Sequence, residues 1–228
     1  MISDLVTVKR SKRARRVALR LDPTQRVINL VVPEKMPLHK AYKFAQDHES
    51  WVRETLSKLD PPFPFKDGAH LPIFGDTVRL SIHIDPNLKR TKIIQHDDVL
   101  EVQTYMDDPT NRIASHLKKI ARAGLADMAT DKADIINKNI SSVTVRDTKS
   151  RWGSCSHKGE LSFSWRLIFA PYDAIDYVIA HEVAHLIHMD HSKNFWTLCR
   201  SLSSNFVEGK FWMQNHGNSL MRYGINDQ

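Results

Sequence analysis

The helix expected after Pro171 constrains the fold more than any other part of the sequence. It contains His181-Glu182-Val183-Ala184-His185, yet its other residues are apolar on nearly every side. A helix of that kind is buried, and each unpaired polar group inside a protein costs roughly 1–3 kcal/mol. Two histidines four residues apart share a face, so both imidazoles can bind one tetrahedral ion. The sequence therefore predicts a metal at this helix, in preference to two core histidines bonded to nearby backbone.

Glu182 follows the first histidine and is expected to face the open coordination position of the metal. A water molecule on zinc has its pKa lowered toward 7. A carboxylate beside that water can take its proton and pass it to a leaving group. We therefore predict one zinc ion as the cofactor and Glu182 as the general base. Nickel, cobalt and manganese are alternative ions for the same ligands.

A third ligand is required, and the sequence offers three candidates. His191 completes the spacing His-Glu-x-x-His-x5-His if the helix ends before it and the chain folds back. His188 shares the face of His181 but lies about 10 Å further along the helix axis. Glu208 stands where the next helix would supply a carboxylate, although its position beside Gly209 is also typical of an acid at a helix start. We predict His191 as the third ligand.

Length and composition favour a globular protein without a membrane partner. The chain has 228 residues, 41% hydrophobic and 26% charged. We see no apolar run near the roughly 20 residues that span a bilayer, and the start of the chain lacks the pattern of a signal peptide. Two cysteines, Cys155 and Cys199, are too few for a disulfide framework. A cytoplasmic location is therefore expected.

A basic block near the N-terminus accounts for much of the net charge of +7. Such a block attracts the phosphates of a nucleic acid or a nucleotide, but it is also typical of the solvated face of a hairpin. Nucleic acid is therefore a possible partner and not an established one. The block consists of Lys9, Arg10, Lys12, Arg13, Arg15, Arg16 and Arg20.

The hydrophobic patterns divide the chain into two regions of an α+β protein. Residues 1–107 are expected to be rich in β-structure, with strands at 17–21, 27–32, 70–84 and 92–105 and one helix at 38–59. Residues 108–228 are expected to carry helices at about 110–130, from 173, and at about 208–220, with strands at 142–146 and 159–169. Every strong chemical feature falls in this second region.

Two stretches of the sequence resemble the YgjP-like metal-dependent hydrolases. One is HEVAHLIHMDHS at residues 181–192, followed by Phe195-Trp196, and the other is RWGSCS at residues 151–156, followed by LSFSWRLI at 161–168. The resemblance covers nearly the whole chain, and this family looks related to the SprT/Spartan and WLM proteases. It implies a zincin-like fold, in which the active-site helix packs on a small antiparallel sheet, a three-histidine zinc site, and hydrolase or metallopeptidase activity.

The segment 151–156 is the predicted substrate-binding region. In zincin-like proteases an edge strand beside the active-site helix pairs with an extended substrate. Gly153 would let a substrate backbone approach closely, with Ser154 next to it. Arg151 and Arg166 could hold a carboxylate or a phosphate, although structural ion pairs are an equally good interpretation. His216, Tyr172 and Tyr177 are weaker candidates for stabilising an oxyanion.

Three functions remain open from the sequence. The first is a metallopeptidase that acts on peptides or proteins. The second is a metal-dependent pyrophosphatase acting on a nucleoside triphosphate such as UTP, an activity associated with the family that the chain resembles. The third is a nucleic-acid-binding module with structural zinc, which the presence of Glu182 disfavours because a closed site needs a fourth ligand and no base.

Overall fold

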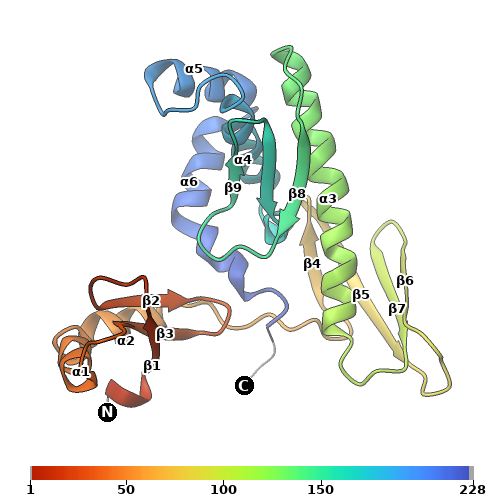
Figure 1. Ribbon diagram of the computed structural model, residues 1–228. Coiled ribbons are helices and arrows are strands. Elements are labelled where there is room, and N and C mark those ends of the chain that lie inside the picture. The colour runs from red at the N-terminus through yellow and green to blue at the C-terminus, as the bar shows by residue number, and fades with distance from the viewer. Residues whose placement is uncertain (1, 226–228) are drawn as a thin grey trace. The chain divides into compact units, whose positions relative to one another are not determined.

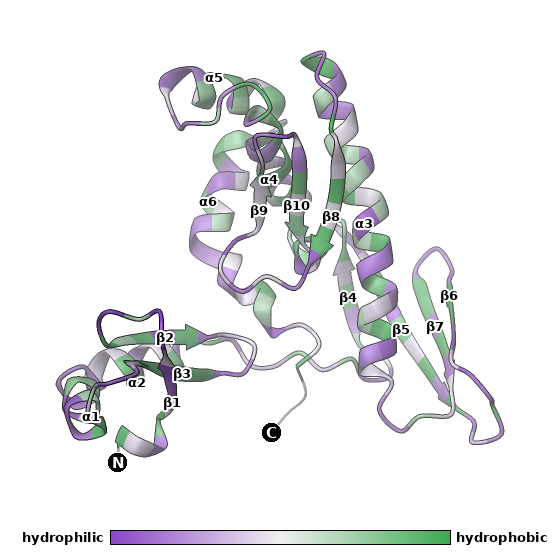
Figure 2. Cartoon of the chain, viewed as in Figure 1, coloured by the Kyte–Doolittle hydropathy of each residue, from purple (hydrophilic) through white to green (hydrophobic). Residues whose placement is uncertain are grey.

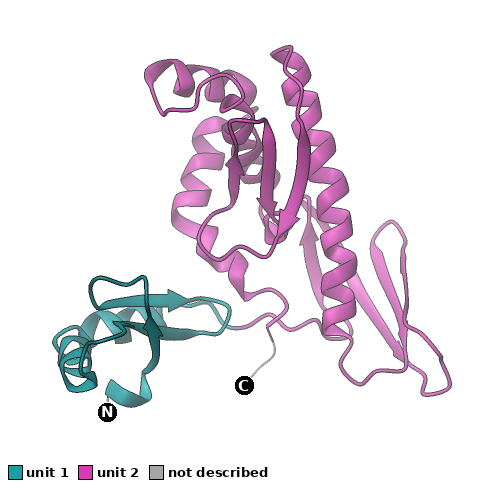
Figure 3. Ribbon diagram, viewed as in Figure 1, with its two compact units in different colours: residues 1–61 teal, residues 62–228 magenta. Residues whose placement is uncertain are grey.

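A computed structural model describes residues 2–225 of the chain. It contains two compact units, Met1–Pro61 and Pro62–Gln228 (Figure 3). The boundary predicted from the sequence lies after residue 107. The change of unit lies at residue 61 instead, because Leu80 and Leu100, from the strands before residue 107, are buried in the same hydrophobic core as the helices after it.

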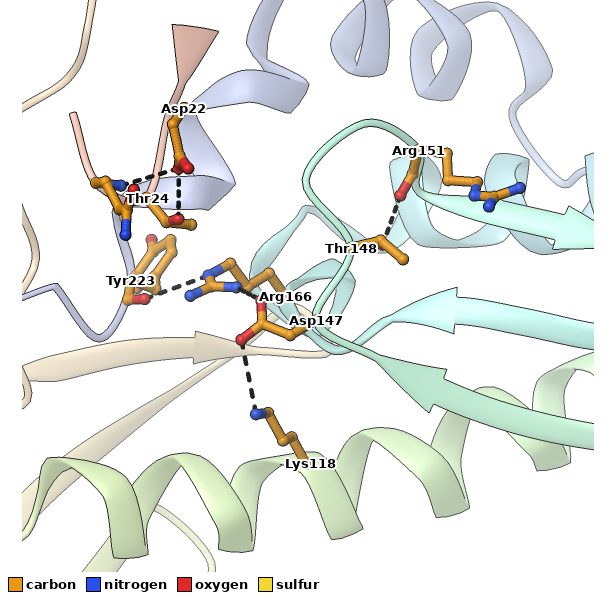
Figure 4. A network of polar contacts seen from close by, with 9 residues as sticks. Asp22, Thr24, Lys118, Asp147, Thr148, Arg151, Arg166 and Tyr223 are labelled. Carbon is orange, nitrogen blue, oxygen red and sulfur yellow. Dashed lines mark hydrogen bonds and ion pairs between the residues drawn. The ribbon is translucent and has the colours of Figure 1, made fainter. Parts of the chain in front are cut away.

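The first unit is a three-stranded sheet covered by two helices. The central strand β3 pairs in parallel with β1 and antiparallel with β2. At the β2–β3 turn, the Asp22 carboxylate accepts hydrogen bonds from Thr24 Oγ1 (2.9 Å) and from Gln25 N (3.1 Å) (Figure 4). The elements are η1 (Ile2–Asp4), β1 (Val6–Ser11), β2 (Ala18–Asp22), β3 (Val27–Pro33), α1 (Leu38–Asp47) and α2 (Glu49–Ser57).

The single helix predicted over 38–59 is interrupted at His48. This residue has φ −116° and ψ 19°, outside the helical range, and it separates α1 from α2. Ala41 and Ala45 of α1 and Val52 of α2 are fully buried in the core of the unit. The break therefore lets two short helices each turn an apolar face toward the sheet.

The basic block lies on β1, on β2 and on the loop between them. One of its members has a structural role, because the Arg10 guanidinium donates hydrogen bonds to the carbonyls of Glu34 (2.5 Å) and Met36 (3.1 Å). Lys12, Arg13 and other cations of the block are exposed. The block is thus mostly a solvated surface of the first unit.

The second unit contains a four-stranded sheet, a three-stranded sheet and four α-helices among its described residues (Figure 1). The strand orders are β4-β5-β7-β6 and β8-β10-β9. The strands are β4 (His70–Ile73), β5 (Asp76–Ile84), β6 (Lys92–Gln95), β7 (Val99–Thr104), β8 (Ser142–Arg146), β9 (Gly153–Cys155) and β10 (Glu160–Ser164). The helical segments are α3 (Thr110–Ile135), η2 (Trp165–Phe169), α4 (Tyr172–Ala184), α5 (Lys193–Leu202), α6 (Phe206–His216) and η3 (Gly217–Arg222). The predicted α+β class is confirmed.

Helix α3 connects the two sheets of this unit. Its buried residues recur every fourth position, from Ile113 and Leu117 to Ala133, and form one apolar stripe. Hydrophobic and hydrophilic residues mix along its length (Figure 2). Although α3 has 26 residues, no helix in the described part of the chain is both long enough and apolar enough to cross a bilayer.

The three-stranded sheet beside α4 is mixed and not wholly antiparallel. Strand β10 runs parallel to β8 and antiparallel to β9. Leu161 and Phe163 of β10 are buried, so Ser162 points to the opposite face. The strand predicted over 159–169 ends at Ser164, because residues 165–169 turn into the buried 3₁₀ segment η2.

A buried ion pair ties the helices of this unit together. Lys132 Nζ of α3 lies 2.5 Å from Asp176 Oδ1 of α4, and their side chains are 12% and 3% exposed. Lys132 also donates to the Leu202 carbonyl at the end of α5. The second carboxylate oxygen of Asp176 accepts from Ser203 Oγ (3.0 Å) and from Ser204 N (2.8 Å). The pair therefore fixes α4 between α3 and the α5–α6 connection.

Replacing Lys132 tests this role. In Lys132→Met the Asp176 carboxylate stays buried without its cation, so we expect the free energy of unfolding to fall by about 3 kcal/mol. Urea unfolding followed by tryptophan fluorescence measures the change. Lys92→Met, at an exposed position of β6, is the control and should stay within about 0.5 kcal/mol of the parent. Equal midpoints for the two variants would contradict the assignment.

Candidate active site

After α4 ends, the chain turns back so that His191 lies near His181 and His185. The helix ends at Ala184, and the amides of Ile187 and His188 bond to the Ala184 carbonyl in a closing turn. Ser192 then caps α5 by accepting a hydrogen bond from Phe195 N (3.4 Å). The helix thus ends before residue 191, as the predicted ligand spacing requires.

Three imidazoles converge at this turn. One ring nitrogen from each of His181, His185 and His191 lies within 4.8 Å of the others. The Nε2 atoms of His181 and His191 are 3.1 Å apart, and the three pairs of ring centroids are 4.9–5.0 Å apart. Among the described residues, neither His188 nor Glu208 belongs to this group.

The donor atoms of the triad suit a divalent ion. His185 Nδ1 lies 2.8 Å from the His188 carbonyl, an arrangement that leaves Nε2 of His185 available as a ligand. His181 Nδ1 is buried without a hydrogen-bond partner. Burial, together with the nearby charges of His185 and His191, lowers the pKa of His181 to about 4. The ring is therefore neutral at pH 7, which is the form that binds zinc.

Two aromatic side chains support the triad from α5. The Phe195 ring centroid lies 4.9, 4.5 and 4.7 Å from the centroids of His181, His185 and His191. Trp196 lies 5.6 Å from both His181 and His191. Phe195 is fully buried, so it forms an apolar floor that holds the three rings in place.

Glu182 packs directly against strand β9. Its side chain is only 6% exposed, and a Cβ placed on Gly153 would lie 2.5 Å from both Cγ and Oε1 of Glu182. Burial raises the pKa of Glu182 to about 8, and the charge of Arg151 opposes that rise. Position 153 must be glycine for this carboxylate to keep its place, a requirement that the sequence analysis did not foresee.

Ser154 and Arg151 border a polar hollow beside the sheet. Since side chains alternate along a strand, Ser154 points away from the face on which Gly153 meets Glu182. It lines a hollow of about 400 Å³ together with Arg146, Arg151 and Ser162. Arg151 is exposed, and its charge acts on Glu182 as well.

Arg166 belongs to a separate polar cluster. Its side chain is almost fully buried, and it donates hydrogen bonds to Asp147 and, over 3.3 Å, to the Tyr223 carbonyl (Figure 4). Lys118 Nζ lies 3.6 Å from the same Asp147 carboxylate. The guanidinium also lies 4.7 Å from the centre of the Trp165 ring. These contacts give Arg166 a structural role, in line with the ion-pair interpretation of this arginine.

The candidate oxyanion donors are separated by the fold. The Tyr177 ring lies 6.1 Å from His181, whereas Tyr172 is half exposed at the start of α4 and His216 lies beside Trp212. Lys210 of α6, which sequence reasoning missed, has its Nζ 4.4 Å from the Trp196 ring. Only the tertiary structure brings Lys210 near the triad.

An α4 helix bearing His-Glu-x-x-His, a third histidine after its end and a mixed sheet at its side are features of α+β metal-dependent hydrolases. A family model described as YgjP-like, metallopeptidase domain, matches residues 15–216. The chain belongs to this YgjP-like family, and the predicted resemblance is confirmed. No curated protein matches the chain significantly, and no solved structure does.

Removing any one imidazole should abolish tight metal binding. We expect His181→Ala, His185→Ala and His191→Ala each to lower zinc affinity at least 100-fold, since even the loss of a residue that only supports a ligand costs about 10- to 100-fold. Competition with a chromophoric chelator measures the affinity. His188→Ala is the control, because His188 supplies only its backbone carbonyl. Parent-like affinity in all three variants would rule out the site.

Gly153→Ala tests the contact between β9 and Glu182. The added methyl group must displace the carboxylate, so we expect hydrolysis to slow by about 10- to 100-fold while the zinc content is unchanged. Thr130→Ala, at an exposed position of α3 that lines neither hollow, is the control and should retain parent-like activity. If Gly153→Ala were as active as Thr130→Ala, the position of Glu182 would not matter for catalysis.

Proposed function

We propose that this protein is a zinc-dependent metallopeptidase with Glu182 as its general base. The observation that carries the proposal is the convergence of three imidazoles beside the buried carboxylate of Glu182, which belongs to the same helix as His181. Membership of a metallopeptidase family supports it. His181, His185 and His191 would hold the zinc ion, which, when bound, supplies Lewis acidity for the attack of water on a carbonyl group.

The residues around the triad have separate tasks in this proposal. The His188 carbonyl orients His185 through Nδ1, and Phe195 keeps the rings from turning. Glu182 takes a proton from the attacking water and delivers it to the leaving nitrogen. Its buried position bears on this role, because burial raises the pKa of Glu182 and makes its ionised carboxylate a stronger base than an exposed one.

The free edge of β9 favours an extended peptide as the substrate. In the described sheet, β9 pairs with β10 alone, so its other edge presents unpaired backbone groups. This strand also contains Gly153, which touches Glu182. A peptide added to that edge would form main-chain hydrogen bonds next to the general base.

Hydrolysis of a nucleoside triphosphate is the second candidate. The hollow that contains Arg146 and Arg151 supports it, since two guanidinium groups and several hydroxyl groups suit a phosphate. The structural engagement of Arg166 weakens it. A module with purely structural zinc is less well supported, because the described group offers three ligands and not four.

Two further expectations belong to this proposal. The exposed cations of the basic block favour contact with nucleic acid, and such binding should weaken steeply as salt rises. Cys155 and Cys199 are both free thiols, which suits the cytoplasmic location that we propose.

Glu182→Gln separates metal binding from catalysis. The amide keeps the shape of the side chain but cannot take the proton, so we expect peptide hydrolysis to fall by at least about 100-fold with full zinc content. Elemental analysis and cleavage of casein followed by mass spectrometry are the measurements. Parent-like cleavage by Glu182→Gln would exclude this residue as the base.

A substrate panel distinguishes the two enzymatic candidates. Zinc-loaded parent protein is incubated with casein and, separately, with each nucleoside triphosphate. Cleavage of casein alone supports the metallopeptidase. Release of pyrophosphate or phosphate without any peptide cleavage would replace that proposal with the second candidate.

A further inference from the structure

A small hollow adjoins the metal site on the side of His185. It has a volume of about 230 Å³ and is lined by His185 itself, by Leu186 and Met189 after α4, and by Lys138, His157 and Lys158. Ligand pockets usually measure about 300–1,000 Å³. The hollow is therefore of a size for one side chain of a longer substrate, and we call it the lysine hollow.

The charge of the lysine hollow is positive. Lys138 and Lys158 both line it, and no carboxylate does. Neither ammonium group takes part in an ion pair within residues 2–225. Two acids are adjacent in sequence to residues that line the hollow. Glu160 lines the other hollow and accepts a hydrogen bond from Ser156, and Asp190 accepts one from Ser192 N (3.2 Å). Two lysines are thus left to attract an anion close to a metal ligand.

The backbone that carries Lys158 is held in place by several hydrogen bonds. Its amide donates to Ser156 Oγ (3.2 Å), and its carbonyl accepts from Ser141 Oγ. Gly159, at φ +75°, completes the turn and donates to the Ser156 carbonyl (2.9 Å). A positive φ at this point favours glycine. The turn is therefore ordered before a substrate arrives, which lowers the entropy lost on binding.

Lys138 is placed by the end of α3. Its amide donates to the Ala133 carbonyl (3.0 Å), in the turn that ends the helix after Ile135. The preceding Asn137 adopts φ 51°, a left-handed conformation common at helix ends. The two lysines thus reach the hollow from separate, hydrogen-bonded turns.

The apolar residues that line the lysine hollow limit which anionic side chains can bind there. Leu186 and the half-exposed Met189 lie on the α4 side of the hollow. A side chain that suits both surfaces has an aliphatic stem and an anionic end. Glutamate and aspartate of a peptide have this form, with glutamate offering the longer stem.

We propose that the lysine hollow is a specificity subsite that binds an acidic side chain of the peptide substrate, next to the bond that is cleaved. The inference rests on the proposed peptidase function and adds a preference to it. Exposed ion pairs contribute modestly, so we expect kcat/KM for a glutamate peptide to exceed that of the matching glutamine peptide by about 3- to 10-fold for the two lysines together.

A peptide library tests the preference. Zinc-loaded parent protein cleaves a mixture-based library in which glutamate, glutamine or lysine is fixed at each position around the cut, and mass spectrometry locates the cuts. The best glutamate peptide and its glutamine twin are then compared by kcat/KM. We expect preference for glutamate at one position, weakening as salt rises.

Charge reversal assigns the preference to the lysine hollow. Lys138→Glu/Lys158→Glu should remove or invert the preference while zinc content and the circular dichroism spectrum match those of the parent. The control, Lys89→Glu/Lys92→Glu, changes the net charge equally at exposed positions that line neither hollow. It should keep the preference.

The outcomes separate the two proposals. Peptide cleavage without preference for glutamate, or a preference that the control variant loses equally, would overturn the subsite alone. Failure of the parent to cleave any peptide, despite full zinc content, would overturn the peptidase proposal and the subsite with it.

Discussion

The packing of three imidazole rings around Phe195 is the interaction on which the candidate metal site depends. Polar rings in an apolar setting need both a rigid support and a common ligand. The support comes from α4, held to α3 by the buried pair of Lys132 and Asp176, and from the turn that returns His191 to the helix. The sheets and the remaining helices provide the core in which α4 is buried.

Strand β9 joins this support to the chemistry that we propose. On one face Gly153 leaves room for the Glu182 carboxylate, and along its free edge the strand offers backbone groups to an extended chain. The polar hollow with Arg151 and the lysine hollow share Ser156, which follows the strand. The short strand β9 thus lies next to Glu182 and close to both cationic hollows.

Sequence reasoning is strongest where the signal is local. The helix that carries His181 and the spacing from there to His185 and His191 involve neighbouring residues, and the confirmed family match covers the same stretch. It was less successful where distant segments meet. The divide at residue 61, the parallel pairing of β8 with β10 and the structural engagement of Arg166 depend on partners many residues away. The types of residue in one segment do not predict which distant segment it will contact.

The sequence by itself determined that a buried helix would present the imidazoles of His181 and His185 on one face, with the Glu182 carboxylate beside the first. It could do so because helical periodicity and hydrophobic burial act over a few residues. The tertiary structure brings His191, the third ligand that the spacing predicted, next to the other two histidines. It also decides why position 153 is glycine and where Lys138 and Lys158 lie beside His185. Those results follow from packing between segments that are distant along the chain, and packing depends on shape in three dimensions.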